Sequence, residues 1–78
     1  MSMTLREMRE RLLAGDHEFR QLSEQHSRYE SQLQQLSENP YLSAEDLILE
    51  AELKKLKLRV KDEMERRIAL HAKSAQTH

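Results

Sequence analysis

Apolar residues recur at steps of three and four residues through the first half of the chain. The spacing continues without a shift through ten positions, of which only Gly15 and His26 are not apolar. The ten positions are Leu5, Met8, Leu12, Gly15, Phe19, Leu22, His26, Tyr29, Leu33 and Leu36. A spacing of about 3.5 residues is typical of a helix that packs along one side against another helix. Because the phase continues through Gly15, we expect one helix over about residues 5–37. In the alternative, Gly15 ends a short first helix and Asp16 caps the next.

Local signals predict where the helices begin and end. Thr4 opens a capping-box sequence with Glu7, which favours a helix start there. Pro40 ends the first helix, because proline disfavours the helical conformation of the residue before it. Ser43 is a favoured N-cap for a second helix. We therefore expect a turn over residues 38–43, a second helix over about 44–72 and a frayed tail over 73–78.

The second helix carries its own apolar stripe, which predicts its packing partner. The stripe comprises Leu49, Leu53, Leu56, Val60, Met64 and either Arg67 or Ile68. A short link between two amphipathic helices makes them antiparallel. The predicted fold is therefore all-α, a single coiled-coil-like, antiparallel two-helix hairpin over residues 1–78. Because two helices form only a thin core, we expect the hairpin to self-associate into a helical bundle.

Composition supports this fold and also indicates in which cell compartment the protein is located. The 78 residues include one Gly, one Pro and no Cys, and 35% are charged while 4% are aromatic. Such a profile is typical of long amphipathic helices, and the lack of Cys excludes disulfides and thiolate metal ligands. No apolar run is longer than three residues, as at 47–49, which is far short of a membrane span, and the N-terminus has no apolar signal-peptide core. A cytoplasmic location fits these features.

The formal net charge of −1 hides an uneven distribution. Residues 16–52 hold nine acids and two bases, a net of −7, whereas residues 53–73 hold eight bases and three acids, a net of +5. The favoured interpretation is that the two halves fold together and neutralise each other. The alternative is an anion-binding surface. Its candidate residues are Lys54, Lys55, Lys57, Arg59 and Lys61.

Candidate chemistry is sparse in this chain. There is no Gly-rich phosphate loop and no His or Cys cluster with metal-ligand spacing, so we predict no catalytic, metal or cofactor site. His26 falls within the apolar stripe of the first helix, where a polar residue can set helix register. A ligand or proton-switch role for His26 is a weaker alternative.

Three leucines of the second helix fall outside its apolar stripe or extend it, and we take them as a candidate interaction face: Leu47, Leu58 and Leu70. The predicted function is a small non-catalytic adaptor that binds another protein through a helical face and forms homo-oligomers. The alternative is a nucleic-acid-associated accessory protein that uses the bases of the second helix. With only three aromatic residues, the chain has no stacking platform for single strands.

Two stretches resemble the small bacterial YdcH-like proteins. One is Gly15-Asp16-His17-Glu18-Phe19 followed by Leu22 and His26, and the other is the Leu-Lys-Lys, Lys-Leu and Lys-Asp-Glu series over residues 53–64. The resemblance covers about residues 12–68. It implies a short, all-helical, cytoplasmic bacterial protein. It implies no mechanism, because that family is grouped as a domain of unknown function.

Overall fold

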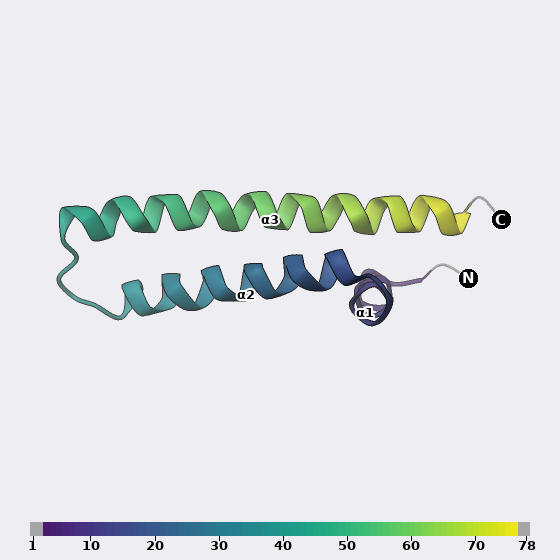
Figure 1. The fold of residues 1–78 in the computed structure, drawn as a ribbon, viewed down its shortest axis with the longest axis horizontal. Helices are drawn as coiled ribbons and strands as arrows, with labels where there is room; N and C mark the ends of the chain where they lie inside the picture. The colour runs from purple at the N-terminus through teal and green to yellow at the C-terminus, as the bar shows by residue number, and fades with distance from the viewer. Residues whose placement is uncertain (1–2, 77–78) are drawn as a thin grey trace.

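The computed structural model describes residues 3–76, with side-chain environments through Lys73. Its elements are α1 (Leu5–Gly15), α2 (His17–Ser37) and α3 (Ala44–Gln76). α2 and α3 lie antiparallel, and α1 is seen almost end-on where the hairpin opens, opposite the loop (Figure 1). The all-α prediction is confirmed, but the two-helix hairpin is wrong because the first predicted helix is divided into two.

The division falls at Asp16, which ends one helix and begins the next. Its backbone is extended, with φ −112° and ψ 107°. Its N–H donates to the Leu12 carbonyl at 2.7 Å, and its carboxylate accepts from the Phe19 N–H at 3.0 Å. The structure therefore has the alternative arrangement, in which α1 ends at Gly15 and Asp16 caps α2.

Packing explains why the chain bends although the apolar phase does not change. Leu12, Phe19 and Ile68 form one buried cluster, against which Met8 and Met64 pack. In one straight helix Leu12 and Phe19 would lie about 10 Å apart along the axis. The bend at Asp16 turns α1 across the hairpin and lets both side chains reach Ile68. The apolar spacing alone does not reveal this change in helix direction, because it is the same on both sides of Asp16.

The other helix ends follow the predicted capping chemistry. Thr4 Oγ1 accepts from the Glu7 N–H at 3.1 Å. At the start of α3, the Ser43 hydroxyl accepts from the Asp46 N–H at 3.1 Å, and the Asp46 carboxylate accepts from the Ser43 N–H at 3.2 Å. This reciprocal pair satisfies two backbone donors that a helix start would leave free.

The second helix extends beyond its predicted end at about residue 72, because α3 continues to Gln76. Residues 73–76 hold no Gly or Pro, so nothing in their backbone chemistry stops the helix. The predicted frayed tail is therefore helical over residues 73–76, and residues 77–78 lie outside the described residues.

The buried core is small. Its members among the described residues are Leu12, Phe19, Leu53, Val60 and Ile68. Ile68, not Arg67, continues the buried stripe of α3 towards the C-terminus. Burying one such side chain stabilises a fold by about 1.5–3 kcal/mol. Two residues of the predicted stripe are poorly covered, since Leu49 is 45% exposed and Leu56 is 38% exposed.

Candidate interaction surfaces

All three predicted interaction leucines lie on α3 and are exposed: 53% for Leu47, 58% for Leu58 and 59% for Leu70. Leu47 and Leu58 are eleven residues apart, which is close to three full helical turns, so they share one side of the helix. Leu70 lies twelve residues beyond Leu58, a further rotation of about 120°. The structure therefore groups Leu47 and Leu58, which we term the outer leucine pair, and turns Leu70 to another side.

The five predicted anion-binding residues do not form one free basic surface. Lys57 Nζ lies 3.2 Å from the Glu30 carboxylate of α2, and Lys54 Nζ lies 3.6 Å from the Glu50 carboxylate one turn earlier in α3. Within residues 3–76, no ion pair is recorded for the remaining three: Lys55, Arg59 and Lys61. The acidic and basic halves thus neutralise each other in part.

The contact between Lys57 and Glu30 changes the acidity of Glu30. The Lys57 ammonium donates a hydrogen bond to that carboxylate and also attracts it electrostatically, and together these lower the pKa of Glu30 from 4.5. Protonated His26 would act in the same direction, since its Nδ1 lies 4.0 Å from the Glu30 carboxylate. The three residues form a polar strip along one side of the hairpin.

His26 is partly buried, as its place in the apolar phase predicts. Its side chain is 23% exposed and lines a groove between the helices together with Phe19, Lys57 and Met64. Glu30 is the carboxylate recorded beside it. A role of His26 in setting the register of the two helices stays a prediction.

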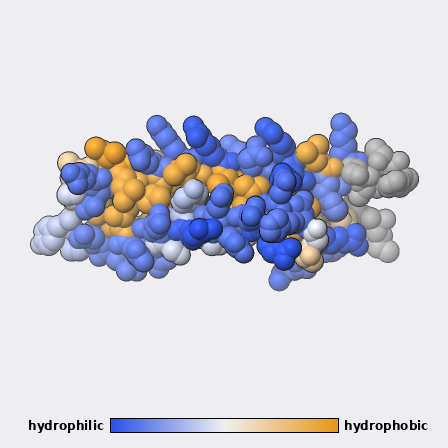
Figure 2. Space-filling view, viewed as in Figure 1, coloured by the Kyte–Doolittle hydropathy of each residue, from blue (hydrophilic) through white to orange (hydrophobic). Residues whose placement is uncertain are grey.

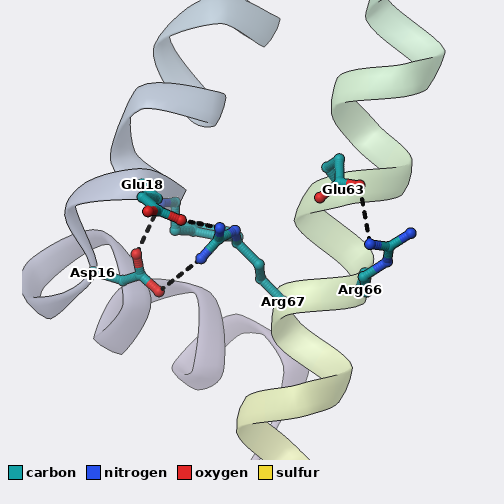
Figure 3. Close-up of polar contacts among 6 residues, drawn as sticks. Asp16, Glu18, Glu63, Arg66 and Arg67 are labelled. Atoms are coloured by element: carbon teal, nitrogen blue, oxygen red, sulfur yellow. Dashed lines mark hydrogen bonds and ion pairs between the residues drawn. The ribbon is translucent and has the colours of Figure 1, made fainter.

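The structure also assembles an ionic cluster that the sequence pattern does not predict. The Arg67 guanidinium of α3 lies 3.6 Å from the Asp16 carboxylate and hydrogen-bonds the Glu18 carboxylate. Figure 3 shows Arg67 reaching across from α3 to both acids at the start of α2. Asp16 thus joins two roles, because one carboxylate oxygen caps α2 while the other faces Arg67. The partial positive charge of a helix N-terminus further favours acids there.

A second apolar surface lies along the edge of α3 that contains Leu49 and Leu56, which we term the edge leucines. Leu49 lines a groove with Leu53 and with Leu36 of α2, near the interhelical loop. Leu56 lies in a shallow depression that Glu52 and Arg59 also line. Figure 2 shows a band of apolar side chains running along one face of the molecule between polar neighbours. Sequence periodicity predicted both edge leucines to be in the core, because the spacing of residues does not show how much of each side chain the neighbouring helix buries.

Over residues 3–76, none of the helices is long and apolar enough to cross a membrane.

Comparison with known proteins identifies a family and no characterised relative. Residues 19–68 match the family described as a protein of unknown function (DUF465), which is the family of YdcH. The match covers α2 from Phe19 onward and most of α3, and it confirms the resemblance drawn from the sequence. No curated protein and no solved structure matches the chain.

Proposed function

The chain belongs to the DUF465 family of proteins of unknown function, and we propose from its own geometry that it is a non-catalytic module for protein–protein interaction. The outer leucine pair carries this proposal. Large aliphatic side chains on one side of a helix, away from the hairpin core, are the anchors that helical interaction surfaces use. The proposal includes a bacterial cytoplasmic setting, which the YdcH-like resemblance implies.

The surroundings of the outer leucine pair support a protein partner. Lys54 and Lys61 lie on one flank of Leu58, and Lys55 and Asp62 lie on the other. The aliphatic stems of the lysines can extend the apolar surface while their charges stay in water. A partner helix with an apolar stripe and an acidic flank facing Lys54 and Lys61 would match this pattern. The lysines would then orient the partner, and burial of the leucines in an apolar groove would contribute to the binding free energy.

The test compares Leu58→Glu with Leu5→Glu in a tagged full-length protein. Leu5 is 57% exposed on α1, so the control introduces the same change at equal exposure on another helix. Lysate of the source organism is split into nuclease-treated and untreated halves, and bound proteins are identified by mass spectrometry. We expect Leu58→Glu to lose specific proteins that wild type and Leu5→Glu retain, with helicity unchanged by circular dichroism.

Two outcomes would count against this proposal. Identical bound proteins for wild type and Leu58→Glu would remove the outer leucine pair as the binding surface. Loss of all bound material after nuclease treatment would favour nucleic acid as the ligand, through the bases of α3. A parallel Leu70→Glu variant determines whether that leucine, on its different side of α3, belongs to the surface.

A further inference from the structure

A row of four charged residues follows the same edge of α3 as the edge leucines. The row, at intervals of seven residues, is Glu45, Glu52, Arg59 and Arg66. Seven residues make almost two full helical turns, so the row stays on one side of α3. Glu52 and Arg59 lie four residues before and three residues after Leu56, spacings at which helix side chains are neighbours. We term these four residues the charge row.

The charge row is acidic in its first half and basic in its second. All four residues are exposed. Within the described residues, Glu45, Glu52 and Arg59 have no recorded ion pair, and Arg66 has one, 3.4 Å from Glu63 of the same helix. A sequence of two acids followed by two bases is complementary to its own reverse. A second copy of α3 running antiparallel would therefore place acids opposite bases along the whole row.

The wider charge distribution of α3 has the same polarity. Residues 44–53 carry four acids and no base, whereas residues 54–73 carry eight bases and three acids. α2 carries three acids and two bases, so its net charge of −1 neutralises little of this polarity. A parallel pair of α3 helices would align like charges, which is destabilising, and an antiparallel pair would align opposite charges.

The surface area is also sufficient for a partner. The chain exposes 6386 Å², whereas a compact monomer of 9.3 kDa exposes about 5,000 Å². The surplus of roughly 1,400 Å² is spread over an elongated molecule of 54 × 21 × 16 Å, and a standard interface buries ~800 Å² on each partner. The half-covered edge leucines, the groove beside Leu36 and Leu53, and the charge row lie along the same stretch of α3.

We propose that this edge of α3 is a homodimer interface in which the α3 helix of a second copy lies antiparallel. Glu52 of each copy then lies opposite Arg59 of the other, and Glu45 of each lies opposite Arg66 of the other. Leu56 of both copies lies next to the twofold axis, where the two side chains bury each other. The inference goes beyond the proposed function, because it names the partner and uses a different side of α3 from the outer leucine pair.

The test is a charge exchange followed by mass measurement of the full chain by analytical ultracentrifugation. Glu52→Arg and Arg59→Glu each replace two opposite-charge pairs of the dimer with like-charge pairs. We expect each single variant to raise the dimer dissociation constant on the order of ten-fold or more. The double variant Glu52→Arg/Arg59→Glu recreates both pairs and should restore a dissociation constant close to that of wild type.

Restoration indicates pairing between copies. Residues 52 and 59 lie about 10 Å apart along one helix, too far to form an ion pair within it. Lys61→Glu is the matched control, because it makes the same charge change as Arg59→Glu on the opposite flank of α3 and should leave the dissociation constant unchanged. All these positions are exposed, and circular dichroism checks that each variant stays helical.

The outcomes separate this inference from the proposed function. A dimer that both single variants weaken and the double variant restores supports it. A wild-type chain that stays monomeric at millimolar concentration, or a double variant weaker than either single one, overturns it. Leu58→Glu should leave the dimer mass unchanged, so loss of other bound proteins in that variant reports on the outer leucine pair alone.

Discussion

Removing the Asp16 carboxylate tests how the break between α1 and α2 is stabilised. In Asp16→Ala the Phe19 N–H loses its acceptor at 3.0 Å, and Arg67 loses one of its two acidic partners. Loss of an N-cap side chain costs about 1 kcal/mol, within a range of 0.5–2. Loss of the ion pair between Asp16 and Arg67 adds about 0.2–0.5 kcal/mol to this cost. This value is at the low end for a partly exposed pair, because Glu18 remains beside Arg67.

The expected total loss is therefore about 1–2 kcal/mol in the free energy of unfolding. For a domain of 60–100 residues, each kcal/mol lowers Tm by about 4–8 °C. Asp16→Ala should thus lower Tm by roughly 5–15 °C, measured by circular dichroism at 222 nm. Urea unfolding of the same samples gives the free energy directly.

Two matched variants separate the cap from the charge. Asp16→Asn keeps a good N-cap and removes the charge, so it should lose less than about 0.5 kcal/mol. Ser43→Ala removes an uncharged N-cap side chain, that of α3, and should cost about 1 kcal/mol. Equal losses in Asp16→Asn and Asp16→Ala would refute the reasoning, because the carboxylate would then act through its charge and not as a cap.

Three further changes have defined expectations. Gly15→Ala should raise the free energy of unfolding by about 0.4–1 kcal/mol in urea titrations. Outside its chain neighbours and the local helix backbone, no atom lies within 4 Å of the added Cβ, and Ala restricts the unfolded chain; a lower free energy of unfolding would contradict this. Phe19→Ala should lower the free energy of unfolding by about 3–5 kcal/mol, because Phe19 is 1% exposed. Tyr41→Ala should change it little, because Tyr41 is 87% exposed, and equal losses in the two variants would contradict the assigned core. The lowered pKa of Glu30 means that its ion pair with Lys57 contributes stability above about pH 4.5, and this contribution disappears as pH falls through the lower folded-state pKa. Thermal unfolding of Glu30→Gln should therefore approach that of wild type with falling pH, and a constant difference between them would argue against the pair.

Most of the secondary structure could be predicted from local chemistry. The capping residues Thr4 and Ser43 form the predicted hydrogen bonds, and α2 ends at Ser37, before Pro40. These signals act within a few residues, so they are readable without tertiary structure. The break at Asp16 also had a local signal in Gly15, but the unbroken apolar phase outweighed it in the prediction.

The candidate surfaces depended on information that a sequence holds only in part. The exposure of Leu47 and Leu58 could be predicted from their position outside the apolar stripe of the second helix. The contact of Arg67 with Asp16 and Glu18 joins residues 49 or more positions apart, and it depends on how α1 and α2 turn at the open end of the hairpin. The exposure of Leu49 and Leu56 likewise depends on how closely α2 approaches α3.

The sequence by itself determined that this protein is helical, where α1 and α3 begin, and that the helices before and after residues 38–43 run antiparallel. Caps, proline and apolar periodicity act through short-range backbone and burial preferences. Only the tertiary structure decided that α1 turns across the end of the hairpin. That turn brings Leu12 and Phe19 together with Ile68 in one buried cluster. Side chains that are distant in sequence bury one another there, so local signals do not predict the contact. The same long-range packing decided which apolar residues of α3 are covered and which remain available to a partner.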